Sequence, residues 1–125
     1  MFSVKESKNM TRIDSLIGEQ CKVVGDLSGK GLLKIDGSIE GNITWDDDVI
    51  LGVLSTINGN LTCKNAIVAG KIHGNVVCNG SLSVEGSGKI VGDITIETLS
   101  VKEGGIINGN CSVVKKENHY ETLED

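Results

Sequence analysis

The chain has 125 residues, a net charge of −5, three aromatic residues and no proline. Its length fits one domain, and an acidic balance with a single arginine lacks the basic surface that direct nucleic-acid binding requires. Aromatic side chains usually dominate the buried area of a globular core, so this composition favours an elongated solenoid with a narrow aliphatic core. No stretch approaches the roughly 18 apolar residues of a membrane span, and no secretory signal follows Met1. We therefore expect a cytosolic protein.

Residues 1–16 precede the first repeat and are expected to form a flexible tail. The tail begins with a short apolar tip followed by positive charge, made of Met1, Phe2, Val4, Lys5 and Lys8. Residues 115–125 form a second tail, which is charged and expected to be disordered. The repeats lie between the two tails, in residues 17–114.

The repeat is a glycine followed by Asn or Asp and flanked on both sides by aliphatic residues. It occurs at Gly25, Gly41, Gly59, Gly74, Gly92 and Gly109. The steps of 16, 18, 15, 18 and 17 residues are too short for paired-helix repeats and suit one coil of three short strands. A hairpin meander is the rival interpretation, because Asn-Gly dipeptides favour tight turns, but it does not need the motif to return in the same phase. The sequence predicts an all-β, single-domain parallel β-helix of about six coils.

Positions relative to the repeat glycine predict the core. Two residues before it stand Val23, Ile39, Ile57, Ile72, Ile90 and Ile107, which we expect to stack as one buried ladder. A second aliphatic column stands two residues after the glycine and shares the inner face, because strand side chains alternate between faces. A further alternating run, such as Leu33 with Ile35, gives a second β face in each coil. The third face is indicated only weakly, by Leu54 before Ile57.

A solenoid ends in open strand edges, which bind further strands unless they are capped. Neither tail contains a convincing amphipathic cap helix, and the last coil is apolar, so we expect rods to join end to end. The predicted polymer interface consists of Ile106, Ile107, Cys111, Val113 and Val114. A monomer whose tails fold over its ends is the alternative.

No catalytic, cofactor or metal site is predicted. His73 lacks an orienting carboxylate, and the chain has no CxxC or Cys/His spacing for a metal. Cys63 and Cys78 occupy one phase of adjacent coils and are expected to be buried thiols. The run Asp46 to Asp48 has no calcium-loop spacing and is interpreted as a solvated corner.

Short motifs along residues 16–114 follow an order that resembles the bactofilin family of bacterial polymer-forming cytoskeletal proteins. The clearest are G-K-I-H-G-N from Gly70 to Asn75, K-I-V-G-D from Lys89 to Asp93, and G-N-C-S from Gly109 to Ser112. The resemblance implies a right-handed, triangular β-helix that polymerises end to end, without nucleotide, into non-polar filaments. It also implies that the apolar and basic tip of residues 1–8 is a membrane-targeting signal.

Through the same resemblance we expect a cytoplasmic scaffold, peripheral at the inner face of the cell membrane, that serves cell shape, polar organisation or cell-wall enzymes. Its partners would be its own copies, the membrane and unidentified cell-wall or polar proteins. The alternative function is a left-handed β-helix enzyme like the acyltransferases, or a monomeric binding module. Filaments formed by the purified protein without nucleotide would favour the first.

Overall fold

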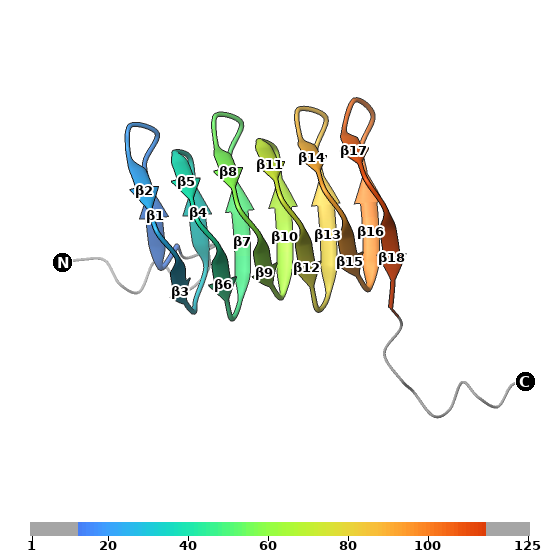
Figure 1. Cartoon of the computed structure of the whole chain (residues 1–125), viewed down its shortest axis with the longest axis horizontal. Helices are drawn as coiled ribbons and strands as arrows, with labels where there is room; N and C mark the ends of the chain where they lie inside the picture. The colour runs from blue at the N-terminus through green and yellow to red at the C-terminus, as the bar shows by residue number, and fades with distance from the viewer. Residues whose placement is uncertain (1–12, 115–125) are drawn as a thin grey trace, which may run out of the picture.

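The computed structural model describes residues 13–114, which wind into six coils of three short strands each (Figure 1). Successive strands belong to different sheets, and every third strand returns to the same sheet. All strand pairings within this range are parallel, which excludes the hairpin meander. Six strands spaced by about 4.8 Å give a rod roughly 29 Å long. The fold is an all-β triangular solenoid.

Each sheet has six strands, one from each coil. Sheet A contains β1 (Ser15–Ile17), β4 (Leu33–Ile35), β7 (Asp48–Leu51), β10 (Asn65–Val68), β13 (Ser81–Val84) and β16 (Thr98–Val101). Sheet B contains β2 (Lys22–Val24), β5 (Ser38–Glu40), β8 (Thr56–Asn58), β11 (Lys71–His73), β14 (Lys89–Val91) and β17 (Ile106–Asn108). Sheet C contains β3 (Leu27–Gly29), β6 (Ile43–Trp45), β9 (Leu61–Cys63), β12 (Val76–Cys78), β15 (Ile94–Ile96) and β18 (Cys111–Val113). The first strand begins two residues before the predicted start of the solenoid.

The repeat glycine is the corner between sheets B and C, which corrects the expected division of each coil into faces. The columns before and after the glycine lie on different strands, and the second of them forms the third sheet. Leu54 does not mark that face, because it lies in the loop between β7 and β8 and is 67% exposed. The corner needs glycine for two reasons. Gly74 has φ +155°, and a Cβ there would overlap the carbonyl oxygen of Gly59 in the coil before.

The uneven steps between repeat glycines come mainly from the connections between sheets A and B, with a further one-residue difference between sheets C and A. In coils 2 and 4 the connection has two residues, 36–37 and 69–70. In coils 1, 3, 5 and 6 it has four residues, 18–21, 52–55, 85–88 and 102–105, and these form the taller loops in Figure 1. The connection between sheets C and A varies as well, with one residue before β10 and β16 (64 and 97) and two before β7 and β13 (46–47 and 79–80). The strands keep their register, so the differences in length are confined to these two corners.

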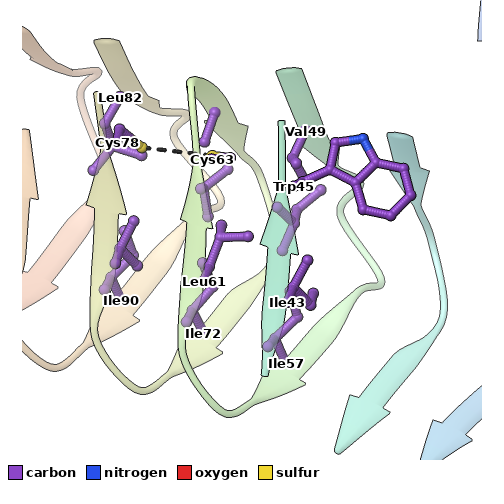
Figure 2. Close-up of a cluster of buried hydrophobic side chains, with 14 of the residues drawn as sticks. Ile43, Trp45, Val49, Ile57, Leu61, Cys63, Ile72, Cys78, Leu82 and Ile90 are labelled. Carbon is purple, nitrogen blue, oxygen red and sulfur yellow. Dashed lines mark hydrogen bonds between the residues drawn. The ribbon is translucent and has the colours of Figure 1, made fainter. Parts of the chain in front are cut away.

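The core is a set of aliphatic columns that run the length of the rod. Ile39, Ile57, Ile72 and Ile90 are fully buried and pair in register, and Val23 and Ile107 continue the ladder half-buried in the terminal coils. The ladder therefore runs as one column through all six coils. Figure 2 shows its central members packed against residues of sheet C, including Ile43 and Leu61.

The Asn or Asp that follows each corner glycine forms a polar ladder on the outside. Its side-chain oxygen accepts a hydrogen bond from the backbone N–H of the equivalent residue in the next coil. Asn60 Oδ1, for example, accepts from Asn75 N at 2.9 Å. An amide or carboxylate of this length satisfies a corner N–H that the sheets leave unpaired, which explains why only Asn and Asp occupy the position.

We predict that Ile72→Asp unfolds the solenoid, because it buries an unpaired carboxylate in the middle of the ladder. The expected loss is about 4 kcal/mol or more of the free energy of unfolding. His73→Asp is the matched control, since the side chain next to Ile72 on β11 is exposed and the change should cost less than about 0.5 kcal/mol. Thermal melting followed by circular dichroism measures both. Equal melting temperatures for the two variants would contradict the assigned faces of β11.

Candidate polymer interface at the ends of the rod

The last coil leaves its inward side chains uncovered, because no further coil packs on them. Val101 on β16 and Val113 on β18 are 44% and 58% exposed. The residues paired with them one coil earlier, Val84 and Ile96, are buried. Chemically equivalent positions thus change from core to surface within one strand spacing. The end of the rod is an apolar face in the shape of the core's own cross-section.

We define this C-terminal end face by the inward residues of the last coil. They are Leu99, Val101, Ile107, Cys111 and Val113. Each stacks on the equivalent residue of the fifth coil, and Ile107 and Leu99 are half-buried there. Among the described residues, β16, β17 and β18 each pair with a strand on one side only. Their other edges present open backbone groups around the apolar centre.

The predicted interface residues divide between this face and the sides of the rod. Ile107, Cys111 and Val113 lie on the end face, whereas Ile106 points outward from sheet B, in register with Lys89. Val114 follows β18, donates its N–H to Ile96 O at 2.8 Å, and lines a shallow groove with Val77 on the sheet C side.

Leu99 and Val101 belong to the end face but were not in the predicted set. The signal for them was present, because both belong to the second alternating run of the repeat.

The N-terminal end is apolar as well, with half-buried Ile17, Val23 and Leu27 as its inward residues. The inward positions that remain are Ser15, which is half-buried and in register with Leu33, and Gly29, whose missing side chain leaves room for the Trp45 ring of the second coil. The Trp45 indole donates to Gly31 O at 2.6 Å and is almost fully buried. Figure 2 shows this ring extending away from the aliphatic column towards the first coil. One large side chain thus fills the core where the glycine leaves it empty.

The chemistry-bearing residues do not come together as a catalytic or metal site in residues 13–114. His73 is exposed on β11. Asp47 Oδ2 accepts from Gly31 N, and Asp48 Oδ1 accepts from the Asn65 side chain, so this acidic corner ties neighbouring coils together. No three metal-ligating side chains in the described range form a group.

Cys63 and Cys78 are stacked in adjacent coils, with their sulfur atoms 3.7 Å apart. Both are free thiols and both are buried. The hydrogen bond with Cys78, together with burial, raises the pKa of the Cys63 thiol well above its usual range. These thiols therefore pack as small apolar groups, while Cys21 and Cys111 are exposed.

The membrane tip of residues 1–8 lies outside the described residues. Within the described range no helix is long and apolar enough to span a membrane.

Comparison with known protein families identifies the family to which this solenoid belongs. A model of the family "Bactofilin: Polymer-forming cytoskeletal" matches residues 15–112, which is nearly the whole solenoid. The chain belongs to the bactofilin family. Its role is accordingly that of a polymer-forming cytoskeletal protein and not that of an enzyme.

Two curated bactofilins of Myxococcus xanthus are similar to this chain. BacP is 28% identical over 114 residues, which cover 90% of this chain and 48% of BacP. BacO is 23% identical over 112 residues, which cover 90% of this chain and 89% of BacO. This bactofilin therefore spans about half the length of BacP and nearly all of BacO.

A solved structure shares the fold. The cryo-EM reconstruction of Thermus thermophilus bactofilin double helical filaments superposes with a TM-score of 0.72 at 16% sequence identity. The match covers 78% of this chain and 98% of that one.

Proposed function

We propose that this bactofilin polymerises end to end through the terminal coils of its solenoid, without nucleotide, and that the filaments are a membrane-associated scaffold. The observation that carries the proposal is the uncovered C-terminal end face, where core residues such as Val113 reach the surface. Covering that face with a second rod removes apolar area from water and pairs the open strand edges. The free energy of assembly comes from burying apolar surface that the folded rod already exposes, so no nucleotide is needed.

The filaments in this proposal are non-polar, because two C-terminal end faces meet about a two-fold axis. An isologous contact of this kind uses the same patch on both subunits. Leu99, Val101, Ile107 and Val113 are all uncharged, so two copies of the face meet without repulsion between like charges. Two N-terminal faces then meet in the same way and extend the polymer.

The cellular part of the proposal is a scaffold at the inner face of the cytoplasmic membrane that supports cell shape or polar organisation and recruits cell-wall proteins. The apolar and basic residues at the N-terminal tip support it. One tip binds a membrane weakly, but a filament presents many copies, and linked copies bind far more tightly than one. Polymerisation and membrane binding are therefore coupled in this proposal.

We predict that Val113→Lys blocks filament formation while the body stays folded. The substitution places an ammonium group where a neighbouring rod must pack, and desolvating that charge costs several kcal/mol. Val113 is already 58% exposed, so the five coils before it keep their core. Ile107→Lys tests the same face, although Ile107 also packs on Ile90. The control is Val77→Lys, which adds the same charge to an outward position of a middle coil.

Negative-stain microscopy without nucleotide, together with size exclusion, measures the outcome. We expect long filaments from Val77→Lys, and monomers or dimers joined through one end from Val113→Lys. Filaments of wild-type length from both end-face variants would contradict the proposed interface.

We predict that filaments joined through paired C-terminal faces can be cross-linked at Cys111. The cysteine is exposed on β18 at the end face, and the two-fold contact puts the Cys111 residues of two subunits on the two faces that meet. In Cys21→Ser protein, which lacks the other exposed thiol, a short bis-maleimide reagent should give dimers and no longer species on a denaturing gel. Head-to-tail assembly predicts no cross-linked dimers, because Cys111 would then face the N-terminal coil of the next copy.

We predict that deletion of residues 1–8 abolishes co-sedimentation with liposomes but leaves filaments intact, because these residues lie outside the repeats. The double substitution Lys5→Ala and Lys8→Ala is the companion variant, which removes the charge and keeps the apolar residues. It should weaken binding to anionic vesicles more than binding to neutral ones. Equal liposome binding by the truncated and full-length proteins would contradict the membrane role of the tip.

A further inference from the structure

The outer face of sheet A carries an apolar patch that the end-to-end contact does not use. Ile50 on β7 and Ile67 on β10 both point outward and pair in register. Among residues 13–114 this is the only place where two outward aliphatic side chains of neighbouring strands stand side by side. Ile67 is 42% exposed. Outward positions on solvated sheets are usually polar, so an adjacent pair of this kind indicates a contact surface.

The patch is hollowed into a groove beside the two isoleucines. The groove has a volume of about 240 Å³, and Leu32 lines it together with Ile50 and Ile67. Asp48 and Asn65 form its polar side. A projecting aliphatic side chain next to an apolar groove is a shape that can fit a second copy of itself about a two-fold axis.

The charges around the patch are already bound within the subunit. Lys34, which precedes Ile50 in the outward column, places its Nζ 2.9 Å from both carboxylate oxygens of Asp36. Asp48 Oδ1 accepts a hydrogen bond from the Asn65 side chain at 3.0 Å. Sheet B differs, because Lys71 and Lys89 lie next to one another in register on its outer face. Two copies repel each other least where such charges are absent or internally paired.

We propose that the sheet A patch, Leu32, Ile50 and Ile67, joins two filaments side by side, so that the occupant of the groove is a second copy of this chain. The Thermus thermophilus bactofilin with the same fold forms double helical filaments, and two strands that wind around each other must touch along their sides. The end faces cannot supply that lateral contact, because they are already used to join rods within each single filament. This lateral pairing rests on the end-to-end assembly proposed above. The sheet A patch is the surface that pairs two such filaments.

The test is Ile67→Lys, with Val77→Lys as the matched control on the outer face of sheet C in the same coil. We expect wild type and Val77→Lys to form double-stranded filaments. Ile67→Lys should give single strands of unchanged length, with half the wild-type mass per unit length in scanning transmission electron microscopy. Ile67→Ser is the second variant, because it removes the apolar side chain without adding a charge and fits an outward position already held by serine in β13.

Each remaining outcome decides against one claim. Double strands from folded Ile67→Lys and Ile67→Ser would overturn the lateral patch. Single strands from wild type would also overturn it and would leave the end-to-end assembly standing. A wild type without any filaments would contradict the proposed function instead. Unchanged filament width together with lost liposome binding in Ile67→Lys would assign the patch to a membrane and overturn the pairing.

Discussion

The structure depends on one constraint: neighbouring coils lie about 4.8 Å apart in register, so each inward side chain must rest on a side chain of its own column. Ile57, Ile72 and Ile90 show the result, a buried column without a break. Backbone atoms at the corners come equally close. Glycine is therefore required there, and the following Asn or Asp binds the backbone of the next coil.

The same constraint makes a rod of this kind a unit of assembly. A globular core closes on itself, but a column of stacked residues has two ends, and the last residue of each column is exposed whatever the length of the rod. Val113 is exposed for this reason although its column partner Ile96 is buried. Ends and sides then have separate tasks in the proposed filament. The ends extend a single filament, and the patch around Ile67 joins two filaments side by side.

Periodicity predicted the coil number and the core columns, and the order of short motifs such as that from Gly70 to Asn75 carried the family resemblance, but neither predicted the division of a coil into sheets. If one continuous strand ran through the glycine, the residues two before and two after it would both face inward. They also face inward if the glycine is a corner between two strands. Spacing cannot separate these arrangements, and only the positive φ of residues such as Gly74 does. The end face was predicted only in part, because the predicted set was taken from the last residues of the repeat. Leu99 and Val101 lie in the same coil but earlier in the sequence, in the preceding alternating run. The packing of Trp45 into the space beside Gly29 could not be predicted, because it depends on the direction in which the Trp45 ring points.

Fibre diffraction from aligned filaments tests most directly whether stacked coils continue from rod to rod. If the rods join through their end faces, their strands lie across the filament axis, and a strong meridional reflection near 4.8 Å follows. Paired C-terminal faces double the axial repeat to about 58 Å, twice the length of one six-coil rod, since each rod spans roughly six strand spacings. Filaments without a meridional reflection near 4.8 Å would show that the rods do not stack along their own axis. Such a result would contradict assembly through the exposed ends of the core.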